Sequence, residues 1–169
     1  MQKLNDLLGL PVLECETGSK IGEVREVILD LDRAAVWGML LNLTEGSQTN
    51  EGILFRDVYS IGRDAVTIRI TDMVTDLTSF LETDSLQCLQ KLVNKTIFTE
   101  AGLNLGVLVD ILFDVTTGEV KNYEVSDGII TDFIHGRMVM PLPQAQVIGE
   151  DKLIVPEVMA KLLQPGLSV

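Results

Sequence analysis

The sequence predicts a mainly β protein that consists of two tandem small β-barrels, a short linker helix and a short C-terminal helix. Three observations support this fold class: an internal repeat, period-two alternation of apolar residues, and glycines where the expected strands must turn. Residues 18–22 (GSKIG) with Asp30 recur 84 positions later as residues 102–106 (GLNLG) with Asp114. The two predicted domains span residues 1–83 and 84–169, and the second includes the linker helix.

An ungapped alignment at the constant offset of 84 defines the strands of both repeats. Val27 and Leu29 match Ile111 and Phe113, and they alternate with polar residues such as Asp30. This alternation is typical of strands with one buried face. The predicted strands are 12–16, 21–31, 35–43 and 65–70 in the first repeat, and 96–100, 105–115, 120–125 and 152–155 in the second.

Glycine and proline locate the turns and the helix ends. Gly118 follows the long strand of the second repeat and suits a turn in the left-handed region, where a Cβ atom would be strained. Apolar residues at helical spacing predict the linker helix over residues 85–93. Pro156 in a first-turn position predicts the closing helix over residues 156–163. Short, bent strands with glycine corners favour a closed barrel over an open sheet.

The chain is strongly acidic, with 25 Asp and Glu against 13 Lys and Arg and a net charge of −12. Both halves carry an acidic excess, and neither has a basic tail. Because affinity for nucleic acids and for anionic membranes depends on Lys and Arg, we expect no direct nucleic-acid binding. No apolar run approaches the ~20 residues of a membrane-spanning helix, so no membrane insertion is expected.

The two cysteines and the N-terminal segment indicate a reduced, cytoplasmic protein. Cys15 and Cys88 occupy non-equivalent positions of the two repeats, which argues against a disulfide framework. Both are expected to be buried, inert thiols. The first residues lack the apolar region of a secretory signal.

With these residues laid out, the chain resembles the PRC-barrel family, in two tandem copies. The resemblance rests on the glycine turn followed by a long strand ending in Asp30 or Asp114, and on residues 126–128 (SDG) and 147–151 (VIGED). It covers about residues 4–72 and 90–158. The resemblance implies a small barrel that docks onto other macromolecules, since family members include a domain of a photosynthetic reaction-centre subunit and one of a ribosome maturation factor. A shared fold does not choose among such partners.

We expect no catalytic, cofactor-binding or metal-binding residues. His135 is the single histidine and has no neighbouring cysteine or second histidine, so a loop residue is expected. Asp30, Asp32 and Asp114 are too few for an oxygen-rich cation loop and are expected to cap turns. Four other acidic residues are expected to lie on a solvated acidic surface: Glu23, Glu26, Asp72 and Asp76.

Some apolar residues lie in the opposite phase to the predicted core face. Two interpretations stay open. Both faces of a strongly bent strand are partly covered within one barrel, or the two barrels bury these residues against each other. The candidate residues for inter-barrel packing are Val24, Ile28, Leu40, Leu108 and Leu112.

Equivalent loops of the two repeats differ in character. Residues 44–51 of the first repeat are polar, whereas residues 126–136 of the second include an apolar cluster. The cluster is expected either to plug the open end of the barrel or to form a partner-docking knob. Its candidate partner-binding residues are Ile129, Ile130, Phe133 and Ile134.

The predicted function is that of a non-enzymatic, cytoplasmic binding or scaffold module that acts through protein contacts, with an unknown partner and homo-oligomerisation as one option. One alternative is an accessory factor in ribosome or RNA maturation that acts through a protein partner, because an acidic surface favours encounter with a basic protein. A second alternative is a peripheral subunit of a membrane electron-transfer or photosynthetic complex.

Overall fold

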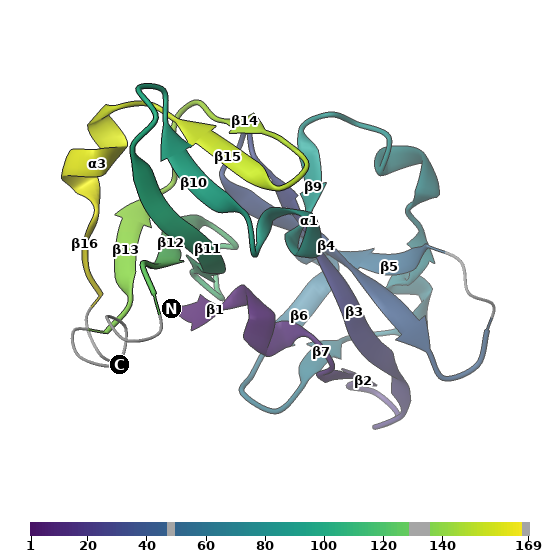
Figure 1. Ribbon diagram of the computed structural model, residues 1–169. Coiled ribbons are helices and arrows are strands. Elements are labelled where there is room, and N and C mark those ends of the chain that lie inside the picture. The colour runs from purple at the N-terminus through teal and green to yellow at the C-terminus, as the bar shows by residue number, and fades with distance from the viewer. Residues whose placement is uncertain (47–49, 129–135, 167–169) are drawn as a thin grey trace. The chain divides into compact units, whose positions relative to one another are not determined.

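The structure is a computed structural model that describes residues 1–46, 50–128 and 136–166 (Figure 1). It is mainly β, with two sheets and short helices, which confirms the predicted fold class. The chain divides into two compact units. The first unit comprises Met1–Lys91 and Phe113–Glu119, and the second comprises Leu92–Leu112 and Val120–Val169. The first unit thus includes a turn from the second repeat.

The sheet of the first unit follows the strand order β6-β7-β2-β3-β4-β5-β8, and β9 pairs with β3 (Figure 1). Strand β2 pairs antiparallel with β3 and parallel with β7. The elements in chain order are β1 (Gln2–Lys3), η1 (Leu4–Leu7), β2 (Pro11–Glu14), β3 (Lys20–Asp30), β4 (Ala35–Leu43), β5 (Glu51–Leu54), η2 (Phe55–Asp57), β6 (Val58–Ile61), β7 (Val66–Ile68), η3 (Thr71–Met73), β8 (Thr75–Asp76), η4 (Thr78–Phe80) and β9 (Leu86–Cys88).

The second sheet repeats the same order with its own strands, β14-β15-β10-β11-β12-β13-β16. Strand β10 pairs antiparallel with β11 and parallel with β15, as β2 does with β3 and β7. The short helix α1 (Leu89–Leu92) precedes β10 in the chain. The other elements are β10 (Thr96–Thr99), β11 (Asn104–Phe113), β12 (Val120–Ser126), β13 (Met138–Pro141), β14 (Val147–Ile148), β15 (Lys152–Val155), α3 (Val158–Leu162) and β16 (Gln164–Pro165).

The cores form where the sequence pattern predicts buried strand faces. Val27 and Leu29 of β3 are fully buried, and so is Ile111 of β11. Val24 and Ile28, in the opposite phase, are also buried, so β3 is covered on both faces along much of its length. Strands buried on both faces read as continuous apolar runs rather than as a strict alternation. Burial of β3 on both faces therefore explains the unbroken apolar run of residues 27–29.

The second glycine of the repeated motif is required by a close approach between strands. A Cβ atom on Gly22 would fall on the carbonyl oxygen of Asn42 in β4. A Cβ atom on Gly106 would likewise fall on the carbonyl oxygen of Ser126 in β12. Backbone oxygens in a paired strand cannot move aside cheaply, so both positions exclude every other residue type.

The true offset between the repeats changes from 85 to 84 within the first turn, which the ungapped alignment did not predict. Gly9 and Asn94 are 85 residues apart and share a positive φ, of 82° and 68°. Their N–H groups donate to the carbonyl oxygens of Val24 (2.8 Å) and Leu108 (2.7 Å), which are 84 residues apart. The turn between β2 and β3 is therefore one residue longer than the turn between β10 and β11. The ungapped alignment missed this difference because side-chain alternation does not continue through a turn.

The predicted linker helix is shorter than expected. Residues 86–88 form strand β9, which pairs antiparallel with β3 through Ile28↔Cys88, and α1 covers four residues. Strand β2 pairs with β3 at residues 20–23, so the same edge of β3 is open farther along at Ile28. Pairing β9 there satisfies backbone groups that would otherwise be buried without partners. The C-terminal helix is α3, within the predicted range.

Candidate interaction surfaces

The turn aspartates satisfy backbone groups of their own turns. Asp30 accepts a hydrogen bond from the N–H of Arg33 at 3.1 Å. Asp114, its counterpart, accepts from the N–H groups of Thr116 (2.8 Å) and Thr117 (3.1 Å). These are Asx-type turns, in which the carboxylate replaces a backbone acceptor. Among the described residues, no group of three or more His, Cys, Asp or Glu side chains could hold a metal ion.

Glu26 was expected on a solvated acidic surface, and that prediction is wrong. Its exposure is 8%, and the equivalent Asp110 is 4% exposed. Each carboxylate accepts a hydrogen bond from the next residue's N–H, at 2.9 Å for Val27 and 2.8 Å for Ile111. Glu26 lies at a break in the β3–β4 register, where a bulge turns its side chain inward. Burial raises the pKa of Glu26, although the hydrogen bonds from Val27 and Gln90 oppose this effect.

The cysteines do not form a reactive pair. Cys15 is exposed, contrary to the prediction, because β2 ends at Glu14 and Cys15 belongs to the following turn. Cys88 is half-buried on β9. Burial, followed by the nearby charge of Glu26, raises the pKa of the Cys88 thiol and so disfavours the reactive thiolate. His135 lies outside the described residues.

Two residues of the opposite-phase set lie in an apolar cluster within the first unit. Ile28 and Leu40 pack with Leu77, and four partly buried residues cover the cluster: Trp37, Leu54, Leu81 and Leu86. Val24 and Leu108 are also buried, and Leu112 is half-buried. Residues from the segment that follows the first barrel therefore cover part of this face. Packing of the two barrels against each other through the set stays a prediction.

An exposed apolar patch surrounds α3 in the second unit. Leu103, Val158 and Leu162 are 54%, 53% and 42% exposed. Val158 and Leu162 are four residues apart on one face of α3, whereas Met159 on the other face is buried.

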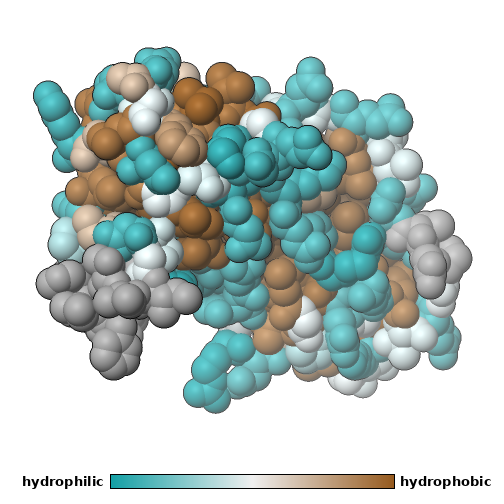
Figure 2. Space-filling model, in the orientation of Figure 1, coloured by the Kyte–Doolittle hydropathy of each residue, from teal (hydrophilic) through white to brown (hydrophobic). Residues whose placement is uncertain are grey.

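The N–H of Ala101 donates to Glu157 Oε1 at 2.7 Å, which brings the turn that carries Leu103 next to the start of α3. We call Leu103, Val158 and Leu162 the α3 patch. Figure 2 shows hydrophobic residues over α3 on the surface of the second unit.

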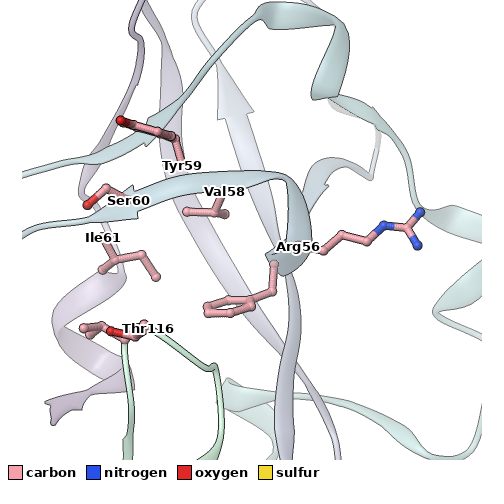
Figure 3. A pocket seen from close by; sticks show the side chains of 8 residues that line it. Arg56, Val58, Tyr59, Ser60, Ile61 and Thr116 are labelled. Atoms are coloured by element: carbon pink, nitrogen blue, oxygen red, sulfur yellow. The ribbon is translucent and has the colours of Figure 1, made fainter.

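A groove lies beside strand β6 in the first unit (Figure 3). Its volume is about 370 Å³. Val58 and Ile61 point from the strand toward Thr116 across the groove, and Arg56 extends away from it. We call this the β6 groove. Its lining residues are Phe55, Arg56, Val58, Tyr59, Ser60, Ile61, Val115 and Thr116.

Sequence reasoning missed both surfaces. The apolar spacing of Val158 and Leu162 was visible in the sequence, but exposure could not be read from it. The β6 groove combines residues about 55 positions apart, Ile61 and Thr116, which no local pattern connects. The sequence-predicted cluster Ile129, Ile130, Phe133 and Ile134 lies outside the described residues.

Comparison with known protein families gives a match over most of the chain. The PRC-barrel domain model matches residues 1–73 and again residues 89–162. The chain belongs to the PRC-barrel family. The tandem arrangement predicted from the repeat is thereby confirmed. The PRC-barrel is a general small β-barrel module, and the family is non-catalytic. No curated protein matches the sequence.

In this PRC-barrel chain, no helix among the described residues is long and apolar enough to cross a membrane.

Proposed function

We propose that this PRC-barrel protein is a non-enzymatic module that binds a partner protein, and that the α3 patch is its main docking surface. The observation that carries the proposal is the exposure of three large apolar side chains, Leu103, Val158 and Leu162, around one helix. Burying such side chains against a partner is favourable by roughly 25 cal/mol per Å² of apolar surface. Apolar clusters that stay exposed are typical of interfaces.

The geometry of α3 suits a docking role. Glu157 accepts hydrogen bonds from the β10–β11 turn, so the helix is held in place before a partner arrives. The pKa of Glu157 is lowered by hydrogen bonds from Thr99 and Ala101, which keeps the carboxylate ionised as an acceptor near neutral pH. A preorganised surface loses less conformational entropy on binding than a mobile one. The apolar segment 129–134 is proposed as a second contact on the strength of its composition.

Affinity purification of the full chain from its native cell tests the proposal. Val158→Glu with Leu162→Glu places two charges in the α3 patch, and Gln164→Glu places one on a neighbouring exposed polar residue. We expect a stoichiometric partner with the wild type and the Gln164 variant, and its loss with the double variant. Thermal unfolding of all three proteins checks that the patch variant is folded. A partner retained by the folded double variant contradicts the assignment to α3. Recovery of no partner across a range of salt concentrations contradicts the binding function.

A further inference from the structure

A second pocket of the first unit lies at the start of β4, on residues that the β6 groove mostly does not use. Its volume is about 230 Å³. The apolar lining comes from Val36 and Trp37 of β4, and from Leu54 and Phe55 where β5 passes into η2. Trp37, Leu54 and Phe55 are each half-buried, so part of every one of these side chains is open to a ligand. We call this the Trp37 pocket.

A β-bulge places Trp37 in the pocket wall. In the β3–β4 ladder, Ile28 pairs with Gly38 and Leu29 pairs with Val36, so Trp37 is the extra residue on β4. Bulges re-aim a side chain and are frequent beside functional sites. The Trp37 ring is held by the Phe80 ring, with centroids 5.3 Å apart and the planes inclined at 48°. The wall is therefore fixed before any ligand arrives.

The Phe55 ring on the opposite wall is also fixed. It lies so close to Gly118 that a Cβ atom there would be 2.7 Å from the ring carbon Cε1. Gly118 is itself tied to the pocket, because its carbonyl oxygen accepts a hydrogen bond from the N–H of Val36 at 2.8 Å. A site whose walls are already ordered loses little conformational entropy when it binds.

Two arginines line the pocket together with one aspartate. The Arg33 side chain is 82% exposed, and its Nε lies 3.7 Å from Asp30 Oδ2. Arg56 makes no ion pair with any described residue, and Figure 3 shows it extending away from the β6 groove. A guanidinium group is attracted to the negative face of an aromatic ring and stacks on it. Because the three charges nearly balance, they favour an aromatic ring over a strongly charged ligand.

The size of the pocket also points to a single ring. An engineered apolar cavity of about 150 Å³ binds benzene. Pockets for drug-sized ligands begin at about 300 Å³. The Trp37 pocket, at about 230 Å³, lies between these limits and matches one aromatic side chain.

The second repeat does not share this lining, although its strands pair in the same way. The pairs Gly38↔Leu54 and Asn122↔Pro141 occupy equivalent positions of the two sheets. On that alignment, Trp37, Phe55 and Arg56 correspond to these residues of the second repeat: Lys121, Leu142 and Pro143. The common fold therefore does not require two aromatic rings and an arginine at these positions.

We propose that the Trp37 pocket receives one aromatic side chain of the partner protein, between Trp37 and Phe55 and against the guanidinium groups of Arg33 and Arg56. Tyrosine and tryptophan are enriched among the residues that anchor protein interfaces, where they fill pockets of the partner. The inference rests on the proposed protein-binding function, and it names the chemical type of a contact made by the first unit.

Titration of the isotopically labelled full chain with N-acetyl-tyrosinamide, an uncharged probe, tests this inference by NMR. Trp37 is the single tryptophan, so its indole N–H signal is unambiguous. We expect saturable shifts of that signal and of amides in residues 30–37 and 54–56, with a Kd on the order of 1 mM. N-acetyl-leucinamide is the control and should bind several-fold more weakly. No saturable shift, equal affinities for the two probes, or shifts confined to other residues would overturn the proposal.

Two matched pairs of variants sharpen the test. Arg56→Gln removes a charge from the pocket, and Arg63→Gln removes one from an exposed arginine outside it. We expect the first to weaken probe binding about two- to fivefold, the range of an exposed cation–π contact. Phe55→Leu removes a wall ring, and Tyr59→Leu removes an exposed ring elsewhere. The expected loss for Phe55→Leu is about two- to tenfold.

The controls of both pairs should bind the probe as the wild type does. Thermal unfolding checks that Phe55→Leu is folded, and Arg56→Gln decides the question on an exposed residue if it is not. Equal affinities within either folded pair contradict the proposal.

The failure of this inference is distinguishable from the failure of the proposed function. A native partner that depends on the α3 patch, but binds Arg56→Gln and Arg63→Gln equally well, removes the pocket inference alone. Recovery of no native partner removes the binding function, even where the probe occupies the pocket.

Discussion

Ala34 and Gly118 occupy the same position in the two repeats, 84 residues apart, and both have a positive φ, of 51° and 76°. Each ends the turn after a long strand, where the chain reverses into β4 or β12. The second repeat uses the residue type that the geometry favours. The first repeat places a Cβ atom in the left-handed region, where it is strained by roughly 1–2 kcal/mol.

Replacement of Ala34 by glycine is expected to stabilise the protein. Removal of the Cβ atom relieves the strain, and part of this gain is offset because glycine adds freedom to the unfolded chain. The net increase in the free energy of unfolding should be about 0.5–1 kcal/mol. Thermal unfolding measures it. Ala35→Gly, one residue further on and at the start of β4, is the control and should destabilise.

The reverse substitution, Gly118→Ala, is expected to destabilise the protein by more than 1 kcal/mol, because it adds steric conflict to the left-handed strain. A Cβ atom at Gly118 would lie 2.7 Å from Cε1 of Phe55. Gly102 has a similar φ of 88°, and a Cβ atom there would meet nothing within 4 Å, so Gly102→Ala isolates the strain. Equal losses of thermal stability in the two variants would show that the Phe55 contact contributes nothing.

The buried Glu26 should make stability depend on pH. Because the pKa of Glu26 is raised in the folded state, its ionised form is disfavoured there, and the folded protein is penalised at pH values above that raised pKa. Glu26→Gln keeps an acceptor for the Val27 N–H and removes the charge. We expect this variant to be more stable than the wild type at neutral pH. The difference should shrink as the pH falls through the raised pKa toward the ordinary value, about 4.3.

Urea unfolding at a series of pH values measures this difference. Glu23→Gln, an exposed glutamate three residues earlier on β3, is the matched control. A stability difference for Glu26→Gln that is independent of pH, or that has the opposite sign at neutral pH, would contradict the account of its burial.

Tyr123 should titrate far above an ordinary tyrosine. It is fully buried, its hydroxyl group donates to Gln146 Oε1 at 3.1 Å, and burial raises the pKa of Tyr123 to about 12. In a Tyr59→Phe variant it is the one tyrosine of the chain, so tyrosinate absorbance reports it alone. Above pH 10 the unfolded chain loses this proton first, and stability should fall as the pH rises from 10 to about 12. A midpoint near 10 while the protein is still folded would contradict the burial of the Tyr123 side chain.

Substitutions in the opposite-phase set test how that face is covered. Ile28→Asp places a charge in the cluster with Leu40 and Leu77. It should lower the free energy of unfolding by several kcal/mol. Leu112→Asp tests the predicted inter-barrel packing, because Leu112 is half-buried and belongs to the set in the second unit. Strong destabilisation by Leu112→Asp supports that packing. An unchanged unfolding temperature for both variants refutes it.

Local pattern was sufficient to predict most strands. The third strand of the first repeat, Ala35–Leu43, and the last strand of the second, Lys152–Val155, have the predicted bounds, because alternation and turn residues are properties of the local chain. The linker was harder to predict. Leu86, Leu89 and Val93 have helical spacing, yet residues 86–88 form a strand because an open edge of β3 is available to them.

The sequence by itself determined that the chain is a duplicated β unit with glycines at its corners, since steric limits on φ and strand spacing act residue by residue. The tertiary structure decided which carboxylates are buried, where the repeats shift by one residue, and which surfaces stay open beside β6 and α3. These features depend on residues brought together from distant parts of the chain, and burial is a property of that assembly rather than of any local segment.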